Sequence, residues 1–305
     1  MIIASIDIGT NTVILLIAEI DAAKGLISPL YNEQRIPRLG KNIHSSKSIS
    51  KAKINELIQI LQDYDKAIRS FNCEKTFITA TNALRIASNK NEIKRIIKNE
   101  LNLEINIVSG EQEADLTFNG AAYQFNDDSK SLVIDIGGGS TEIIYGKKSD
   151  IIYKKSYQIG VVAAKEKFFR HSPPLPSETL SFQNELKRVF NDLKKEHFIF
   201  DRAIAIAGTP TTLAAIKLNL SEYNEELLEG LKLNRNEIMN LLREIKTLKD
   251  ADILKKYKAM VKGREDVILS GAVILLFLME LLYIDEVIVS TKGIRYGVIY
   301  NELFI

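Results

Sequence analysis

The sequence predicts an α/β protein made of two related domains with a ligand cleft between them. β-type and helical segments alternate along the chain, and a glycine-containing motif occurs twice. The 305 residues, of which 46% are hydrophobic, suffice to bury a core in each domain. The two copies of the motif read Ile6-Asp7-Ile8-Gly9-Thr10-Asn11-Thr12 and Ile134-Asp135-Ile136-Gly137-Gly138-Gly139-Ser140-Thr141. Such a duplication indicates two halves that each offer one tight turn to a shared ligand.

The predicted elements follow one another in two similar series. In the first third we expect strands at residues 2–7, 13–20, 75–79 and 104–108, and helices at residues 51–71 and 92–101. The middle of the chain starts the series again with a strand at residues 131–136, a glycine turn and a strand at residues 141–145. Later we expect strands at residues 203–207 and 286–290 and a last helix near residues 294–303.

Two breaks and one apolar run stand out between these elements. The domain boundary is expected near residues 120–129, where a helical pattern gives way to Asn126-Asp127-Asp128-Ser129, which is a linker or a plain surface loop. Pro173-Pro174-Leu175-Pro176 predicts a stiff loop between helices. The uncharged run at residues 267–279 is shorter than the roughly 20 residues that span a bilayer as a helix, so we expect a buried helix and no membrane span.

The charge balance and the single cysteine exclude several classes of function. Lys and Arg number 41 against 39 Asp and Glu, so the chain lacks the basic excess that generic DNA or membrane-surface binding requires. Cys73 alone excludes an intramolecular disulfide and any cysteine-based metal cluster, and it fits a reducing, cytoplasmic compartment. The N-terminal residues lack the pattern of a signal peptide. His44, His171 and His197 show no ligand spacing, so we expect them at the surface or in packing roles.

Both glycine motifs carry groups that suit a phosphate and a hard cation. Their glycines let the backbone turn tightly and bring N–H groups close to phosphate oxygens, and the neighbouring hydroxyls add donors. The carboxylates of Asp7 and Asp135 cannot bind phosphate directly, but they can hold Mg²⁺ or its waters beside it. A single Asp-x-Gly sequence is often an ordinary hairpin turn, whereas its repetition favours ligand binding.

Several segments, taken in order, resemble one protein family. They are residues 5–11, Thr79-Ala80-Thr81-Asn82-Ala83-Leu84-Arg85, Ser109-Gly110-Glu111-Gln112-Glu113-Ala114, residues 133–142, Gly208-Thr209-Pro210-Thr211-Thr212 and residues 290–297. In this order and spacing they resemble the exopolyphosphatase and guanosine pentaphosphate phosphohydrolase (Ppx/GppA) family of the actin and sugar kinase superfamily. The resemblance implies two actin-like domains, formed by residues 1–122 plus 291–305 and by residues 123–290.

The resemblance also implies which acids carry the chemistry. Glu113 matches the glutamate of the family's Ser-Gly-x-x-Glu-Ala motif and is implied to be the general base, since an acid near an anionic substrate can have its pKa raised towards operating pH. Glu111 is the competing candidate, but on a helix it faces elsewhere and favours the helix dipole. Glu142 matches an acidic position that serves water or Mg²⁺, with an exposed strand charge as its alternative. Together with Asp7 and Asp135 these acids make an all-oxygen set suited to Mg²⁺ or Mn²⁺.

Three arginines in family motifs are candidates for binding phosphate and stabilising transition-state charge, with an ordinary surface position as the alternative. They are Arg85, Arg264 and Arg295. The family usually has an acid where this chain has Tyr296, and often one near Thr291, so no salt bridge or metal contact is transferred there. The phosphate-binding candidates are Gly9, Thr10, Asn11, Thr12, Gly137, Gly138, Gly139, Ser140, Thr141, Gly208, Thr209, Arg264 and Arg295. For Gly208 and Thr209, which open a helical run, a structural turn is the alternative. Lys-rich residues 246–258 either line a track for a polyanion or form a solvated face.

Three functional hypotheses follow. The first is a phosphohydrolase that removes terminal orthophosphate from inorganic polyphosphate, or converts pppGpp to ppGpp, by direct attack of water with Glu113 as base and Mg²⁺ or Mn²⁺ as cofactor. The second is phosphoryl transfer from ATP to an acceptor, as in sugar or acetate kinases. The third is a sensor that binds polyphosphate or guanosine alarmones without turnover, for which Tyr296 and Thr291 leave room. We expect no DNA or membrane partner and consider a homodimer. Because the chain ends soon after Gly297, without the helical extension of longer relatives, we expect short polyphosphate chains or the nucleotide to be preferred.

Overall fold

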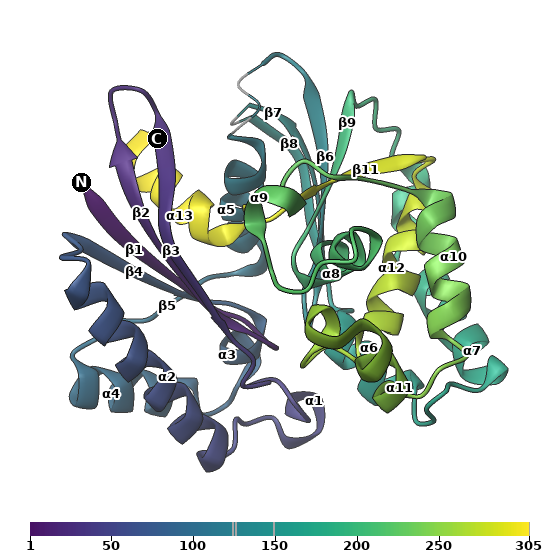
Figure 1. Ribbon diagram of the computed structural model, residues 1–305, viewed down its shortest axis with the longest axis horizontal. Coiled ribbons are helices and arrows are strands. Elements are labelled where there is room, and N and C mark those ends of the chain that lie inside the picture. The colour runs from purple at the N-terminus through teal and green to yellow at the C-terminus, as the bar shows by residue number, and fades with distance from the viewer. Residues whose placement is uncertain (124, 126, 149, 305) are drawn as a thin grey trace. The chain divides into compact units, whose positions relative to one another are not determined.

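The computed structural model describes residues 1–304 except Gln124, Asn126 and Ser149. Two compact units are present, one formed by Met1–Tyr123 with Gly293–Ile305 and the other by Gln124–Lys292, and each is an α/β layer structure (Figure 1). The fold class predicted from the sequence is therefore confirmed. The expected linker includes Gln124 and Asn126, which lie outside the described residues.

A five-stranded mixed sheet forms the centre of the first unit. Its strands, in spatial order, are β3 (Leu26–Arg35), β2 (Val13–Asp21), β1 (Ile2–Ile8), β4 (Lys75–Ala80) and β5 (Asn106–Ile107). β1 pairs antiparallel with β2 and parallel with β4. Successive side chains of β1 point to opposite faces, so Ile6 and Ile8 join one core and Ile3 joins another.

Helices cover both faces of this sheet. α2 (Lys51–Ser70) and α4 (Lys90–Leu101) pack on one face, and α13 (Ile294–Phe304) packs on the other beside α5 (Gly110–Ala122) (Figure 1). α1 (Ile43–Ser46) and α3 (Asn82–Ile86) are short helices in the connections. α5 and α13 approach backbone to backbone, since a Cβ atom on Gly297 would lie 1.6 Å from the Leu116 carbonyl oxygen. The glycine is required there because any side chain would separate the helices.

The second unit repeats this plan with one added strand. Its order is β10 (Lys232–Asn234), β11 (Glu286–Ser290), β9 (Arg202–Ile206), β6 (Lys130–Ile136), β7 (Thr141–Lys147) and β8 (Asp150–Tyr157). The three-stranded meander β6–β7–β8 corresponds to the meander β1–β2–β3, and β9 corresponds to β4. β1 and β6 also bury their residues at the same positions, with Asp7 and Asp135 half-buried in the equivalent place.

One continuous core joins the helices of the second unit to its sheet. The helices are α6 (Val161–Phe168), α7 (Pro176–Val189), α8 (Gly208–Lys217), α9 (Glu225–Leu228), α10 (Arg235–Ile245), α11 (Asp250–Tyr257) and α12 (Ile268–Leu281), with 3₁₀ turns η1 (Asn191–Lys195) and η2 (Lys258–Val261). α12 is the buried helix expected at residues 267–279. Among the described residues, no helix has the length and apolar character needed to cross a membrane.

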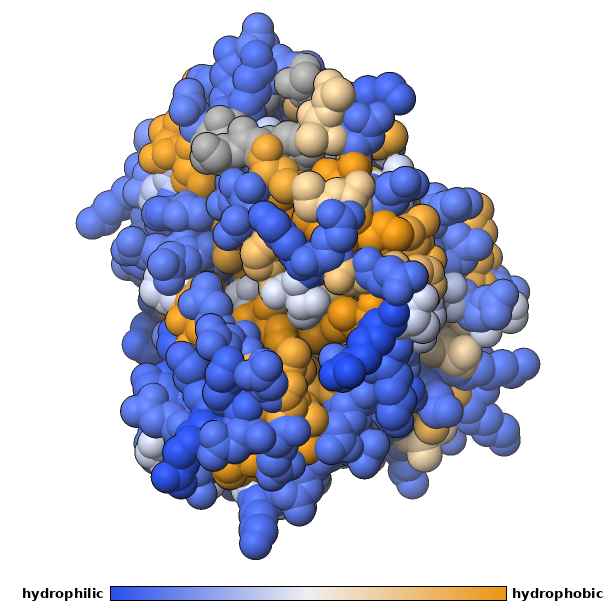
Figure 2. All heavy atoms as spheres, turned by 90° about the vertical axis from the view of Figure 1, so that its left-hand side faces the viewer, coloured by the Kyte–Doolittle hydropathy of each residue, from blue (hydrophilic) through white to orange (hydrophobic). Residues whose placement is uncertain are grey.

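Polar residues dominate the face of the molecule in Figure 2, where hydrophobic residues show as patches between them. His44, His171 and His197 are all exposed, as the sequence suggested. Cys73 is a free thiol that packs against the first unit's core, and its burial raises the pKa of the thiol. In the described part of the chain, no three His, Cys, Asp or Glu side chains gather as a metal site.

Candidate active site

The two glycine motifs form matching turns, one between β1 and β2 and the other between β6 and β7. The Gly9 amide donates to the Thr12 carbonyl at 2.8 Å, and the Gly137 amide donates to the Ser140 carbonyl at 3.0 Å. In both units the last paired residues of the two strands flank the turn directly: Ile8 pairs with Val13, and Ile136 pairs with Thr141. The repeated sequence is thus a repeated backbone structure, with N–H groups concentrated in a tight turn as phosphate binding requires.

Each turn rests on a glycine that the sequence reasoning did not single out. In the first unit the Gly40 amide donates to the Thr10 carbonyl at 2.8 Å, and a Cβ atom on Gly40 would lie 2.2 Å from the Thr10 Cγ2 atom. In the second unit a Cβ atom on Gly160 would lie 2.6 Å from backbone atoms of Gly137, Gly138 and Gly139. The available signal was one isolated glycine after each hairpin, which is too common to identify a site.

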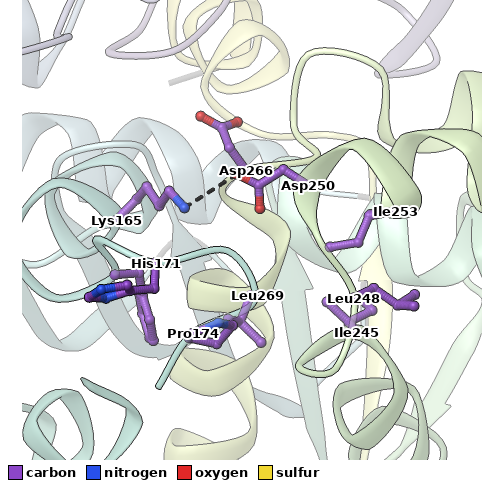
Figure 3. A pocket seen from close by; sticks show the side chains of 10 residues that line it. Lys165, His171, Pro174, Ile245, Leu248, Asp250, Ile253, Asp266 and Leu269 are labelled. Atoms are coloured by element: carbon purple, nitrogen blue, oxygen red, sulfur yellow. Dashed lines mark hydrogen bonds and ion pairs between the residues drawn. The ribbon is translucent and has the colours of Figure 1, made fainter. Parts of the chain in front are cut away.

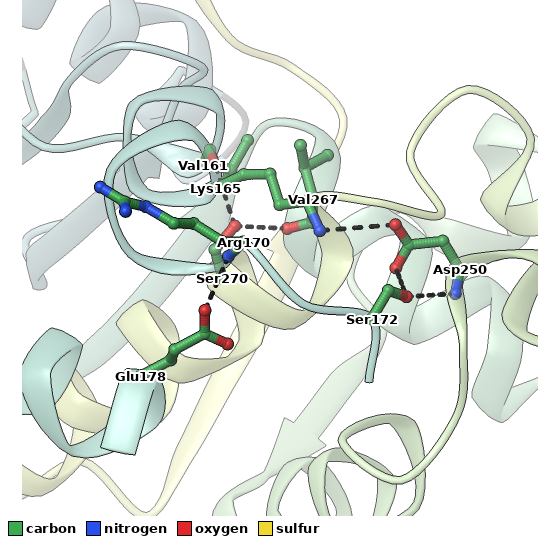
Figure 4. A network of polar contacts seen from close by, with 8 residues as sticks. All are labelled: Val161, Lys165, Arg170, Ser172, Glu178, Asp250, Val267 and Ser270. Atoms are coloured by element: carbon green, nitrogen blue, oxygen red, sulfur yellow. Dashed lines mark hydrogen bonds and ion pairs between the residues drawn. The ribbon is translucent and has the colours of Figure 1, made fainter. Parts of the chain in front are cut away.

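Backbone amides at the start of α6 donate hydrogen bonds to carbonyl groups of the second glycine turn. The Val161 and Val162 amides donate to the Gly137 and Gly138 carbonyls at 3.0 and 2.8 Å. On the other side, the Ser270 hydroxyl from α12 lies 2.9 Å from the Val161 carbonyl oxygen (Figure 4). These bonds connect the turn, the first residues of α6 and the core helix α12.

A polar network holds the segment that follows α6. The Ser172 hydroxyl donates to Asp250 Oδ1 at 2.7 Å and accepts from the Asp250 amide at 2.8 Å, while Lys165 Nζ lies 3.4 Å from Asp250 Oδ2 (Figure 4). Nearby, His171 and two backbone amides donate to Glu178. These bonds outweigh the effect of burial and lower the pKa of Glu178 to about 2. The network therefore fixes the loop between α6 and α7.

A small cavity beside this network is structural. Lys165, Asp250 and Asp266 line it together with apolar side chains of Ile253 and Leu269 (Figure 3). Its volume is about 10 Å³, room for roughly one water molecule. A phosphate group cannot enter it, so the cavity is not a substrate site.

Glu113, which is buried, and Arg85, which is half-buried, form an ion pair in the first unit. Arg85 Nη1 donates to Glu113 Oε2 at 2.8 Å and to the Val108 carbonyl at 3.0 Å. Burial raises the pKa of the Glu113 carboxyl, and Arg85 partly opposes that rise. Glu111 is exposed, as expected for the residue that faces away from the site.

Backbone bonds bring this pair to the same end of the sheet as the first glycine turn. The Thr81 amide, just before α3, donates to the Ile8 carbonyl at 3.1 Å, and the Val108 amide donates to the Ala80 carbonyl at 3.1 Å. The segments that follow β1, β4 and β5 therefore lie side by side. They carry the Gly9 turn, Arg85 and Glu113 respectively.

Glu142 is fully buried, which excludes the alternative of an exposed strand charge. It lies directly opposite Asp135 in the β6–β7 ladder and accepts a hydrogen bond from the Ser156 hydroxyl at 2.6 Å. Two carboxylates thus lie opposite each other in this ladder. Mg²⁺ commonly uses one or two carboxylates together with phosphate oxygens and water, so the oxygen donors present fit it.

The other two arginines have partners within their own units. Arg264 Nη1 donates to the Gly208 carbonyl at 2.8 Å and to the Thr212 hydroxyl at 3.1 Å, where α8 begins. Arg295 is 7% exposed and donates to Asn32 Oδ1 of β3 at 2.6 Å. Their roles as phosphate ligands stay predictions.

Comparison with known proteins decides the family. Residues 16–304 match the model of the Ppx/GppA phosphatase family. This chain belongs to that family. The crystal structure of the Aquifex aeolicus Ppx/GppA family member is 33% identical with a TM-score of 0.84, covering 99% of this chain and 97% of that one.

Curated relatives of this Ppx/GppA chain differ in length. Exopolyphosphatase 2 of Mycobacterium tuberculosis is 28% identical over 97% of each chain. A bifunctional 3-dehydroquinate synthase/phosphatase of Fusobacterium nucleatum is 33% identical over 97% of this chain but only 46% of the relative. A guanosine-5′-triphosphate,3′-diphosphate pyrophosphatase of Pseudoalteromonas translucida is 28% identical over 98% of this chain and 59% of the relative. The chain thus spans about half the length of two of these proteins.

At Tyr296 and Thr291 this chain has no acid, although the Ppx/GppA family usually or often has one at or near these positions. Tyr296 is fully buried and stacks on Tyr123, with ring centroids 6.2 Å apart. Thr291 bonds to Glu229 instead of carrying an acid itself: its amide and its hydroxyl each lie 2.6 Å from Glu229 Oε2. Both departures thus have a packing or hydrogen-bonding role within their own units.

Proposed function

We propose that this Ppx/GppA chain is a phosphohydrolase that releases terminal orthophosphate from inorganic polyphosphate or converts pppGpp to ppGpp. The observation that carries the proposal is the buried Glu113–Arg85 pair beside the first glycine turn. A buried carboxylate with a raised pKa suits a general base, and an adjacent arginine suits an anionic substrate. The printed names of two relatives, an exopolyphosphatase and a guanosine-5′-triphosphate,3′-diphosphate pyrophosphatase, support the substrate class.

In the proposed reaction a water oxygen attacks the terminal phosphorus in line with the bridging oxygen. Glu113 takes one proton of the water, the bond from phosphorus to the bridging oxygen breaks, and its electron pair stays on the leaving phosphate chain. Arg85 Nη2, which is buried and has no hydrogen-bond partner among the described residues, donates to a phosphoryl oxygen. Within the first unit Asp7 is a proposed ligand of Mg²⁺ or Mn²⁺, and within the second unit Asp135 and Glu142 are; a metal bound by either set would neutralise phosphate charge.

The test is orthophosphate release by purified protein with Mg²⁺, offered polyphosphate and pppGpp in parallel. Glu113→Gln should lose about 10²- to 10⁴-fold of the rate while staying folded. Glu111→Gln is the matched control, because this acid lies on the same helix but is exposed, and it should keep its rate. A fully active Glu113→Gln variant would refute the base assignment, and absence of release by the wild type from both substrates would refute the proposed function.

A further inference from the structure

We propose that Asn82 is a substrate-binding residue: its side-chain amide donates to the terminal phosphoryl group and accepts a hydrogen bond from the attacking water. The identity of the substrate rests on the proposed function. The reasons for a ligand at this residue are independent of that function.

The fold leaves the Asn82 amide unsatisfied. The residue is 2% exposed, and neither Nδ2 nor Oδ1 has a hydrogen-bond partner among the residues that the structure describes. Buried amides are almost always hydrogen-bonded, because losing water without a replacement partner is unfavourable. An asparagine at a helix start is usually explained by capping, yet α3 begins without a side-chain capping bond. A ligand or an ordered water is the remaining source of partners.

Asn82 also lies where a phosphate is expected. It is the first residue of α3, and the preceding Thr81 amide bonds to the Ile8 carbonyl, so it follows directly on the strand end beside the first glycine turn. Arg85 is three residues further on, which places both side chains on one face of the helix. Arg85 Nη2 and Asn11 Oδ1 are also buried without partners in the described chain. Three incompletely bonded side chains at one end of a sheet indicate a ligand site.

The chemistry of the amide fixes its orientation. An asparagine offers two N–H donors and one carbonyl acceptor, whereas an ionised terminal phosphoryl group only accepts. Nδ2 therefore faces the phosphoryl oxygens. Oδ1 needs a donor, and the attacking water has two protons, of which one goes to Glu113 and the other bonds to Oδ1. In this arrangement Asn82 orients the water and the phosphoryl group relative to each other and transfers no proton.

Two substitutions at Asn82 and a matched control separate binding from folding. Asn82→Ala should melt no lower than the wild type, because no hydrogen bond is lost, yet raise the KM for inorganic tripolyphosphate by about tenfold or more. Asn82→Asp keeps an acceptor but adds charge, so it should bind tripolyphosphate more weakly than Asn82→Ala. Asn119 is the control: it is 6% exposed and its Nδ2 donates to Asn301 at 2.7 Å, although its Oδ1, like that of Asn82, has no partner among the described residues. Asn119→Ala should therefore melt lower and keep the wild-type KM.

The increase in melting temperature on adding tripolyphosphate gives a readout that needs no turnover. Asn82→Ala should lose most of the wild-type increase, and Asn119→Ala should keep it. An Asn82→Ala variant that melts lower and keeps the wild-type KM would make Asn82 structural and overturn the proposal. If the wild type releases no orthophosphate, the proposed function fails, but the melting experiment still decides: equal increases in wild type and Asn82→Ala, including none, overturn the role of Asn82.

Discussion

Replacing Arg85 by glutamine tests whether the buried ion pair controls the protonation of Glu113. The two groups are joined by a 2.8 Å hydrogen bond, and their side chains are only 19% and 11% exposed. Removing one partner of such a pair leaves an uncompensated buried charge and costs about 3–5 kcal/mol. The residual exposure favours the lower end, about 3 kcal/mol, which corresponds to a fall in melting temperature of roughly 10 °C for a unit of this size.

The sign of the pH dependence follows from the Glu113 pKa. Burial raises this pKa and Arg85 lowers it, so Arg85→Gln should raise it further above the unfolded value. A group with a raised folded-state pKa stabilises the fold at low pH and loses that contribution as pH rises. The deficit of Arg85→Gln relative to the wild type should therefore be smaller at about pH 4.5, where the raised pKa keeps more of Glu113 protonated, than at about pH 8, where less of it is protonated.

Urea unfolding followed by far-ultraviolet circular dichroism measures this effect, since the chain has no tryptophan to report by fluorescence. The double variant Arg85→Gln/Glu113→Gln is the control, because it has neither charge and should recover most of the stability at about pH 8. An Arg85→Gln deficit of the same size at both pH values would refute the reasoning. So would a double variant as unstable at about pH 8 as Arg85→Gln alone.

Three further substitutions test the backbone of the site and the departures from the family. Gly160→Ala should raise the KM for tripolyphosphate by about tenfold or more in an orthophosphate assay, because its Cβ atom would lie 2.6 Å from the second glycine turn. Gly297→Ala should cost about 3 kcal/mol in urea unfolding, since its Cβ atom would overlap the Leu116 carbonyl; wild-type stability would contradict the observed crossing of α5 and α13. Tyr296→Asp, which introduces the family's usual acid, should cost roughly 4 kcal/mol because it buries an unpaired charge, and a stable variant would show that an acid is accommodated there.

The sequence predicted the strands and helices that have a clear hydrophobic period. The helix expected at residues 51–71 is α2 (Lys51–Ser70), and the strand expected at residues 2–7 is β1 (Ile2–Ile8). β3 and β8, the edge strands that pair with β2 and β7, were not predicted. β3 has mostly exposed or half-buried residues and contains Pro29, so it lacks the alternation that identifies a strand. An edge strand is defined by its neighbour's hydrogen bonds more than by its own composition.

The site could be predicted only as far as its residues stand in sequence motifs. The glycine turns were recognised because the motif occurs twice, and Glu113 was recognised from the family resemblance. The Gly40 and Gly160 contacts were not predictable, because each depends on how closely one backbone segment passes another. The unsatisfied amide of Asn82 is likewise a property of burial, which no local pattern encodes.

The duplicated turns share a backbone but differ in the charges beside them. In β1, Asp7 stands opposite the apolar Ile14, and the nearby Glu113 is neutralised by Arg85. In β6, Asp135 stands opposite Glu142, which accepts a hydrogen bond from the Ser156 hydroxyl. The first unit thus places an arginine beside its buried acid, whereas the second places two carboxylates opposite each other in a ladder. Duplication therefore accounts for the matching backbone of the two turns, whereas the acid opposite Asp135, at the place where Ile14 stands opposite Asp7, distinguishes the second turn from the first.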